Sequence, residues 1–470
     1  MGLPGKEINE SKDRIRTALT NTGFEVPDSR LTVNLAPADV PKTGSRFDLS
    51  IAIGILAAQK LLPLEHLAHS FYVGELSLEG SVRGVTGVMS LALMASKSGK
   101  IHLYVPIDNA SEAAVVDGVT VYPVANLRQL IDHLVGKALI TPQTQTIIDQ
   151  FEPHYLTDFA DVRGQGQAKR ALEIAAAGGH NIHLRGVPGA GKTLLARAFP
   201  SILPPLSKAE MLEVTQIYSV TGLLSGAPIV AERPFRAPHH TTSRIGLIGG
   251  GSNPAPGEIS LAHRGVLFLD EFPEYERGTI EALRQPMEDG IVTISRAAGT
   301  VVFPARFLLL AASNPCPCGY LGHPTKKCSC PQTGILKYRK KLSGPILDRI
   351  DLHIDIPPVA YEKLHGTDEA ESSRDIRDRV VHARGRQMQR LAAVHKYANA
   401  EMSSIDVRKL CVIEKEASAL LKQAAEHLSL SARSHFKIIK VAQTIADLVG
   451  SDTISHIHIA EALQYRPKDE

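Results

Sequence analysis

Hydrophobic and polar residues alternate differently in the first, middle and last parts of this 470-residue chain. Residues 1–140 combine a helix-period stretch, NESKDRIRTALTNTGF, with strand-like runs such as LTVNLA, SFYVGELSLEGSV and IHLYVP. Glycine and proline separate these runs, so the pattern predicts an α/β domain. The periodicity weakens over residues 141–158, which carry two prolines, and we interpret this stretch as a linker.

The middle part, residues 159–358, alternates strand candidates with helical stretches. The strand candidates are NIHLRG, GVLFLDE, GIVTIS, TVVFP and RFLLLAAS. Such alternation predicts a parallel sheet with helices on both faces. Residues 359–470 follow the helix period almost throughout, with a break near HKYANAEMSSID, and predict a helical bundle.

Composition adds only a few limits to this picture. The chain is 43% hydrophobic and has 52 basic and 49 acidic residues, so its formal charge of +3 neither indicates nor excludes nucleic acid. The longest apolar run, Leu49–Ala58, is about half of the roughly 20 residues that a membrane span needs. The N-terminus lacks the layout of a signal peptide and cysteines are few, so we expect a cytoplasmic protein with no membrane partner.

A phosphate-binding loop is indicated by HLRGVPGAGKTLLARAF, which lies between a strand candidate and a helical stretch. In this motif glycines let backbone N–H groups approach phosphate oxygens, the lysine reaches the β and γ phosphates, and the hydroxyl ligates Mg²⁺. A chance match of the pattern is the alternative. The predicted nucleotide-binding residues are Gly186, Val187, Pro188, Gly189, Ala190, Gly191, Lys192 and Thr193.

Two acidic residues follow the apolar run in RGVLFLDEFPEY. A buried strand that ends in two acids, with a phosphate loop upstream, favours a magnesium-holding carboxylate at Asp270 and a water-polarising carboxylate at Glu271. The other interpretation is an exposed turn. We therefore expect hydrolysis of ATP with Mg²⁺, rather than nucleotide binding alone.

Two further candidate residues, Asn314 and Arg349, follow the acid pair along the chain. The run RFLLLAASN is expected to lie between the other two phosphate-facing strands, with Asn314 near the γ-phosphate or the attacking water. LSGPILDRIDLHIDIP places Arg349 in a short polar break before another strand. An arginine there could enter a neighbour's active site, where such residues raise rates by about 10³ to 10⁵. A surface salt bridge is the alternative role.

Together these segments resemble an AAA+ ATPase. More narrowly, RPFRAPHHTTS, GEISLAHRGVLFLDE, NPCPCG and GPILDRIDLHI resemble the magnesium-chelatase-like ATPases of bacteria, the YifB/ComM family. The resemblance covers essentially the whole chain and implies a P-loop AAA+ core with a C-terminal helical lid. It also implies that Arg349 is a finger acting on the neighbouring subunit, and that Arg433 in the lid is a second sensor of the phosphates.

The same resemblance implies a function. It suggests a ring of six subunits that hydrolyses ATP to move DNA, branched or single-stranded, with helicase or branch-migration activity in natural transformation and recombination. A chelatase motor that drives metal insertion into a porphyrin is one alternative. A non-enzymatic scaffold is another.

The N-terminal domain resembles the peptidase domain of Lon proteases, which suggests proteolysis as a rival function. Matching PKTGSRFDLSIA places Arg46 where the nucleophilic serine belongs, and GSVRGVTGVMSLALMA places Met89 where the lysine base belongs. Neither side chain can perform that chemistry, so we expect a binding or assembly platform. Family members usually carry further strand-rich sequence before the point at which this chain begins, so we expect the domain to lack its first strands.

Four of the five cysteines lie in NPCPCGYLGHPTKKCSC. A tetrahedral Zn²⁺ site could be formed by Cys316, Cys318, Cys328 and Cys330. His323 is a substitute ligand, and a metal-free thiol-rich loop or a redox sensor is the alternative to zinc. A zinc ion there would be structural and would hold the loop between Asn314 and Arg349.

A long insertion before the acid pair is basic and rich in glycine. Its basic residues are Arg233, Arg236, His239, His240 and Arg244. If such loops line the pore of a ring, they can hold a phosphate backbone without reading bases. The paired histidines could instead bind a metal or cap the fold. KYRKKL, by itself a solvated face, is a second basic cluster, and together the two make DNA the expected partner.

Overall fold

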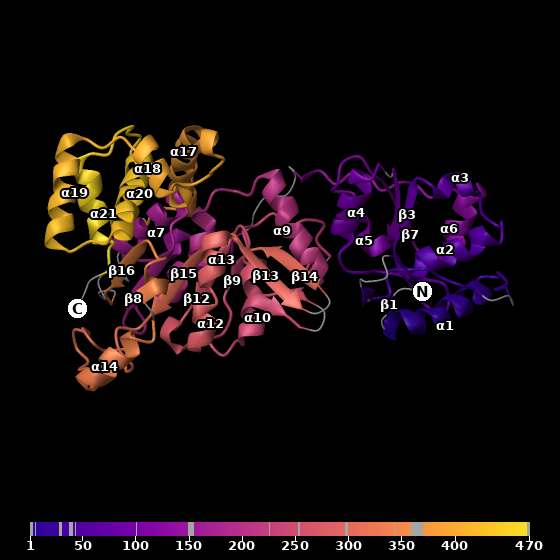
Figure 1. Ribbon diagram of the computed structural model, residues 1–470, viewed down its shortest axis with the longest axis horizontal. Helices are drawn as coiled ribbons and strands as arrows, with labels where there is room; N and C mark the ends of the chain where they lie inside the picture. Colours follow the sequence, from indigo (N-terminus) through magenta and orange to yellow (C-terminus); the bar gives the residue numbers. More distant parts are fainter. Residues whose placement is uncertain are drawn as a thin grey trace. The chain divides into compact units, whose positions relative to one another are not determined.

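The computed structural model describes residues 3–4, 6–27, 31–36, 41–42, 44–99, 101–148, 155–224, 226–251, 254–296, 299–342, 344–358 and 370–467. Its elements, labelled in Figure 1, form two compact units. The first comprises Met1–Glu152, Ser207–Ala231 and Ile294–Val301, and the second Pro153–Leu206, Glu232–Thr293 and Val302–Glu470. Residues 149–154 of the predicted linker and 359–369 of the predicted lid lie outside the described ranges. Within those ranges, no helix combines the length and apolarity that crossing a membrane requires.

A three-stranded parallel sheet forms the centre of the first unit, in the order β3 (Ser70–Tyr72), β6 (His102–Pro106), β7 (Thr120–Val124). Two short pairs accompany it: β1 (Leu3–Pro4) with β2 (Pro41–Lys42), and β4 (Glu75–Leu76) with β5 (Val82–Arg83). The helices of this unit are α1 (Lys6–Asn21), α2 (Asp48–Ala58), α3 (Leu64–Leu67), α4 (Val88–Lys97), α5 (Ile107–Ala113), α6 (Leu127–Leu134) and α9 (Lys208–Thr221). This mixture agrees with the predicted α/β domain.

One predicted strand of the first unit is wrong and another was missed. LTVNLA forms no strand, and its apolar side chains Leu31 and Val33 stay 43% and 40% exposed, so no core face holds it. The run TVYPV forms β7 although it contains Pro123. Proline argues against a strand in sequence reasoning. Here β7 ends the sheet order, and a terminal strand tolerates the missing N–H.

The sheet of the second unit has five parallel strands, in the order β16 (Leu352–Ile356), β8 (Ile182–Gly186), β15 (Leu308–Ser313), β12 (Val266–Leu269), β9 (Phe235–Arg236). Every residue of β12 and β15 is buried, as expected of a parallel sheet covered on both faces. The central strand β15 lies between β8 and β12, which confirms the predicted order.

Two of the predicted strands do not join this sheet. GIVTIS and TVVFP form β13 (Ile291–Arg296) and β14 (Gly299–Pro304), a two-stranded sheet of their own. Buried and exposed residues alternate along β13, whereas β14 is largely exposed. Strands of this kind cannot occupy a layer that is covered on both faces. The short strands β10 (Gly249–Gly250) and β11 (Ala255–Pro256) form another separate pair.

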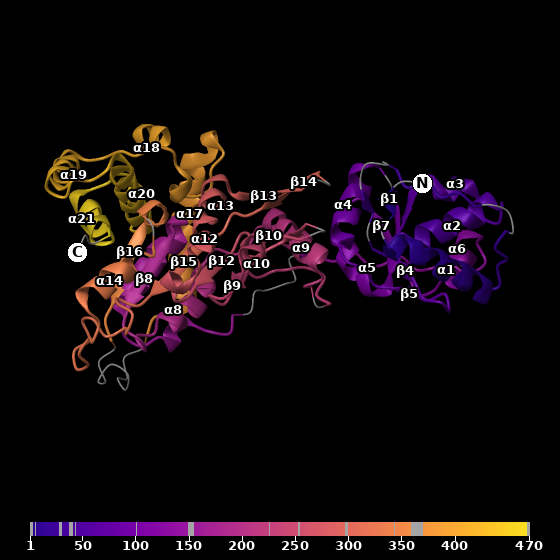
Figure 2. The ribbon, with the colours of Figure 1, turned by 60° about the horizontal axis from the view of Figure 1, so that its bottom comes forward.

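Helices pack around the five-stranded sheet. Those of the α/β part are α7 (Gly166–Gly178), α8 (Lys192–Ala198), α10 (Arg244–Ile248), α11 (Glu258–Leu261), α12 (Arg277–Glu281), α13 (Arg284–Asp289), α14 (Gln332–Arg339) and α15 (Gly344–Leu347). The lid contains α17 (Ser373–Leu391), α18 (Ser404–Leu410), α19 (Lys415–His427), α20 (Ala432–Leu448) and α21 (His456–Gln464). Figure 2 shows these helices grouped beside the β16 edge of the sheet. One hydrophobic core runs from α7 and the sheet into α17, α20 and α21.

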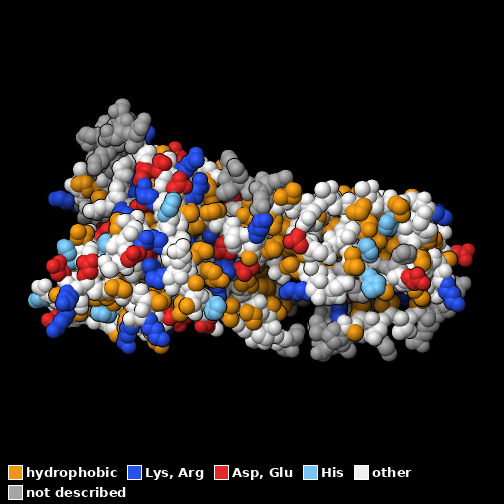
Figure 3. Space-filling view, turned by 90° about the horizontal axis from the view of Figure 1, so that it is seen from above, with side chains coloured by type: hydrophobic (Ala, Val, Ile, Leu, Met, Phe, Trp, Pro, Cys, Tyr) orange, Lys and Arg blue, Asp and Glu red, His pale blue; other side chains and the backbone are white. Residues whose placement is uncertain are grey.

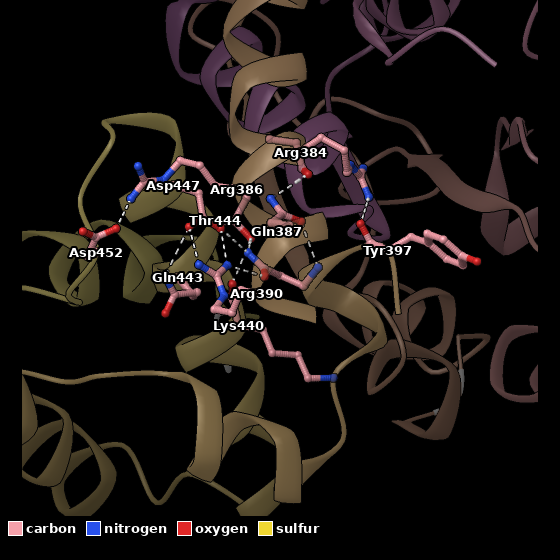
Figure 4. A network of polar contacts seen from close by, with 12 residues as sticks. Arg384, Arg386, Gln387, Arg390, Tyr397, Lys440, Gln443, Thr444, Asp447 and Asp452 are labelled. Carbon is pink, nitrogen blue, oxygen red and sulfur yellow. Dashed lines mark hydrogen bonds and ion pairs between the residues drawn. The ribbon is translucent and has the colours of Figure 1, made fainter. Parts of the chain in front are cut away.

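A buried polar network fixes the lid to the sheet (Figure 4). Arg390 on α17 donates to both carboxylate oxygens of Asp447 on α20, at 2.8 and 2.6 Å, and Gln387 donates to the carbonyl of Ala177 on α7. His180, before β8, contacts the Thr444 hydroxyl of α20 at 2.8 Å. Satisfied buried networks of this kind rigidify the elements that they join.

Candidate nucleotide site

The phosphate loop begins where β8 ends and finishes where α8 begins. Gly189 and Gly191 have φ angles of +79° and +87°, which residues with a side chain rarely adopt. A Cβ atom on Gly186 would lie 2.6 Å from the carbonyl oxygen of Ile356 in β16. The motif therefore needs these glycines for two reasons: the turn itself, and the close approach of the neighbouring strand.

Lys192 is the first residue of α8 and is only 8% exposed. Its Nζ donates to the carbonyl oxygens of Gly186 and Val187, at 2.7 and 3.0 Å, and to Oδ1 of Asn314 at 3.1 Å. Burial lowers the pKa of this ammonium, while the charges of Asp270 and Glu271 act to raise it. The lysine is thus held inside the loop, where an incoming phosphate would replace neutral oxygens as its partner.

Oxygen ligands suited to magnesium meet at the end of β12. Thr193 Oγ1 donates to Oδ2 of Asp270 at 2.9 Å, and Oδ1 of Asp270 accepts from the N–H of Glu271 at 2.9 Å. A hydroxyl and a carboxylate in contact are what Mg²⁺ prefers when it also binds phosphate oxygens. The residues present therefore fit the ion.

Glu271 projects from a constrained point of the backbone. Its φ of 49° lies in the left-handed region, where residues with a side chain are strained. Its carboxylate is 53% exposed, and Oε2 lies 3.3 Å from Nδ1 of His240. The rings of His240 and His239 lie against each other at a tilt of 34°, with centroids 4.1 Å apart. The paired histidines, predicted to belong to a loop that holds a phosphate backbone, with a metal site or a cap as alternatives, thus lie beside the predicted water-polarising residue.

Cysteine side chains converge immediately beyond Asn314. The Sγ atom of Cys316 lies 3.4 Å from that of Cys318 and 3.6 Å from that of Cys328. The sulfur atoms of all four cysteines lie within 4.8 Å of one another. Four thiolates around zinc at about 2.3 Å would be about 3.8 Å apart, so the set fits the ion. Backbone N–H groups of Tyr320 and Ser329 lower the pKa of the Cys318 thiol to about 6.

The cysteine loop lies directly against the phosphate loop. A Cβ atom on Gly319 would lie 2.6 Å from Cγ of Pro188. His323, the predicted substitute ligand, does not belong to the cysteine cluster. Its Nδ1 accepts from the N–H groups of Thr325 and Lys326, at 3.1 and 3.0 Å.

The two predicted phosphate-sensing arginines lie together in a second group of charges. Arg349 and Arg433 both contact Oε1 of Glu288, the latter at 3.4 Å. Arg349 also donates to the carbonyl of Pro345. Among the described residues, no hydrogen bond or ion pair connects this group to Lys192 or Asp270. Sequence reasoning missed Glu288, because nothing in its local pattern distinguishes it from a solvated acid.

Two arginines of the predicted DNA-binding loop are engaged within the protein. Arg233 donates to the carbonyls of Pro204, Pro205 and Arg264. Arg236 forms a two-point ion pair with Glu258, at 2.7 and 2.8 Å. These side chains hold the loop to the core, which leaves Arg244, exposed at the start of α10, as the better candidate for an outside ligand.

The candidate peptidase positions of the first unit make contacts with other groups. Met89 is fully buried, and its N–H donates to Oε1 of Glu112 at 2.8 Å. The hydroxyl of Ser45 contacts a carboxylate oxygen of Glu75, and that of Ser50 contacts the carbonyl of Tyr72. In the part of the chain that the structure describes, neither hydroxyl lies against a lysine or histidine.

Comparison with known proteins gives three family matches along the chain. Models described as subunit ChlI of Mg-chelatase, as magnesium chelatase subunit ChlI, and as the C-terminal part of that subunit match residues 1–109, 158–364 and 370–466. Competence protein ComM of Haemophilus influenzae is 44% identical over 471 residues, covering 99% of this chain and 91% of that protein. The chain belongs to the YifB/ComM family of magnesium-chelatase-like AAA+ proteins.

Other relatives show how far this family extends. The YifB proteins of Salmonella typhimurium and Escherichia coli are 43% and 44% identical, each over 100% of this chain and 91% of its own length. The magnesium-chelatase 67 kDa subunit of Chlorobaculum parvum is 28% identical over only 33% of this chain and 23% of that subunit. Membership of the YifB/ComM family implies an ATPase that uses ATP and Mg²⁺, and the predicted P-loop fold is confirmed.

Proposed function

We propose that this protein is an ATP-driven ring of six subunits that moves DNA, with branch-migration or helicase activity during natural transformation. The observation that carries the proposal is the division of the site. Lys192, Thr193 and Asp270, the proposed ligands of phosphate and magnesium, lie close together within one chain. Arg349 stands in a separate group, where a neighbouring subunit's nucleotide could reach it. Such an arrangement makes turnover depend on assembly.

The residues of one chain supply most of the proposed hydrolysis. Lys192 and the loop N–H groups would hold the β and γ phosphates. Thr193 and Asp270 would hold Mg²⁺, and the ion when bound would supply positive charge beside the phosphate oxygens. Glu271 accepts a proton from the attacking water. The water oxygen bonds to the γ phosphorus, the bond to the bridging oxygen breaks, and ADP and phosphate leave.

DNA is proposed as the polymer because of the competence role named for the relative ComM and because of exposed basic residues. Arg244, Lys337 and Lys340 are exposed on or next to α10 and α14. On the face shown in Figure 3, basic and acidic side chains are interspersed, and no single basic area dominates. Contacts from several small sites around a ring suit a backbone that is held without base recognition.

The test is the ATPase rate of the purified chain with a four-way junction, single-stranded DNA, duplex DNA or no DNA. Stimulation by one of these, most by the junction, is the expected result, and Arg244→Ala should reduce stimulation without changing the basal rate. The matched control is Lys208→Ala, which removes a basic side chain from α9 instead. Equal rates in all four conditions, together with formation of a magnesium porphyrin in a fluorescence assay, would replace the DNA motor with a chelatase motor.

We also propose that the four cysteines hold one structural Zn²⁺ per chain. The four thiols are close enough together for tetrahedral coordination, and a reducing cytoplasm would keep them as thiols. The ion would fix the turn at Gly319 against Pro188. Elemental analysis of the wild type should give one zinc per chain, and of Cys328→Ser combined with Cys330→Ser none. Cys411→Ser, which lies outside the cluster, is the control. A metal-free wild type with full thermal stability would end this proposal.

A further inference from the structure

Glu288 lies where two arginines from different parts of the second unit converge. Arg349 follows α15 and Arg433 lies on α20, yet Oε1 of Glu288, on α13, contacts both guanidinium groups. Two guanidinium groups at such close range repel each other, and a carboxylate between them offsets that repulsion. We infer that Glu288 is a positioning residue that holds Arg349 and Arg433 side by side as one receptor for the phosphates of a neighbouring subunit's nucleotide.

A side-chain hydrogen bond joins the segments that carry the two arginines. Lys437, one turn along α20 from Arg433, donates to the carbonyl of Ile350 at 2.8 Å. Asn181 donates to the carbonyl of Arg349 at 3.1 Å and so fixes it to the start of β8. The Lys437 bond therefore holds the two segments together, and the task that remains for Glu288 is to orient the flexible ends of the arginines.

The group also carries unbalanced charge. Two guanidinium groups contact one carboxylate, which leaves an excess of positive charge. The side chain of Arg349 is 14% exposed, whereas Arg433 and Glu288 are 47% and 48% exposed, so an anion can approach from the side of the latter two.

This inference rests on the proposed ring ATPase, and it makes a different prediction from a structural ion pair. The pair of Glu288 with Arg433 is half exposed, and the glutamine amide oxygen still accepts a hydrogen bond from Arg349, so Glu288→Gln should leave the melting temperature and ring formation nearly unchanged. It should lower kcat roughly tenfold, because the receptor is less well aligned, while KM for ATP stays the same. Glu288→Asp should recover part of the loss. Asp289→Asn, the exposed acid next along α13, is the matched control and should behave as wild type.

Mixed rings decide between positioning in trans and any role at the chain's own nucleotide. A Glu288→Gln subunit keeps its own Lys192 site, and a Lys192→Ala neighbour keeps its own arginine receptor. Mixing the two should therefore raise activity above either alone, with differently tagged subunits copurified to show that mixed rings form. No recovery, or an unchanged kcat for Glu288→Gln, overturns the inference. If Arg349→Ala also fails to complement Lys192→Ala, the proposed function falls with it; if that pair complements, only the role of Glu288 is lost.

Discussion

The two charged groups of the second unit differ in how complete they are. The nucleotide group around Lys192 satisfies its own hydrogen bonds, and the lysine itself is 8% exposed. In the arginine group around Glu288, the side chains of Arg433 and Glu288 are 47% and 48% exposed and that of Arg349 is 14% exposed. The first group can receive a ligand inside one chain. In the proposed ring, the second would face the nucleotide of a neighbouring subunit.

The difference follows from the elements that build each group. The ends of β8, β12 and β15 position Lys192, Asp270 and Asn314, and hydrogen-bonded parallel strands allow little variation. Arg349, Glu288 and Arg433 come from three helical or turn segments, which are held by ion pairs through Glu288 and by the bond from Lys437 to the carbonyl of Ile350. Strand ends thus give a preformed site, whereas the arginine group depends on charge balance.

The largest expected effect comes from removing Arg349 from the arginine group. Arg349→Ala should lower kcat by about 10³ to 10⁵, with ATP binding retained, because the chain's own phosphate site is untouched. Measured turnover and nucleotide affinity separate the two. Mixing with Lys192→Ala subunits should restore part of the activity. A strictly monomeric wild type with full turnover would contradict the division into two half-sites.

Glu271→Gln tests the residue that joins binding to hydrolysis. The amide cannot take a proton from water, so turnover should fall by about 10² to 10⁴ while ATP still binds and the ring stays loaded. Retained radiolabelled ATP after gel filtration measures this. Rapid hydrolysis by the variant would remove Glu271 from the mechanism.

Lys192→Ala removes the central side chain of the nucleotide group. Loss of the charge-assisted contact should reduce nucleotide binding or turnover by at least about 100-fold. Binding of a fluorescent ATP analogue provides the measurement. Leu194→Ala, one position removed from the motif and 42% exposed, is a control that should bind normally. Unchanged turnover in the lysine variant would refute the site.

The smallest effect concerns the sheet that supports the nucleotide group. Burial lowers the pKa of His183 on β8 to about 4, so the unfolded chain binds a proton more readily than the folded chain between about pH 6.5 and 4. Stability should therefore fall through that window as pH decreases, by at most about 1.4 kcal/mol per pH unit for this group. Urea unfolding should show a shallower pH dependence for His183→Gln. An identical dependence would assign the acid sensitivity to other groups, such as His353, whose pKa burial lowers to about 3.

The nucleotide group could be predicted from sequence because its residues lie in contiguous motifs that follow the ends of strands. Gly186 to Thr193 needs only one strand and one helix, and Asn314 follows from the order of the buried strands. Glu288 could not be predicted, since its partners lie 61 and 145 residues away and meet through side chains alone. Sequence reasoning wrongly assigns β13 and β14 to the main sheet, because periodicity alone does not identify the strand with which another strand pairs.

The contact of Gly319 with Pro188 gives the cysteine loop a mechanical connection to the nucleotide. The space beside Gly319 admits only a hydrogen atom, so the cysteine loop packs directly against the phosphate loop. An oxidant that reshapes the thiol cluster would therefore press on the phosphate loop without entering the nucleotide site.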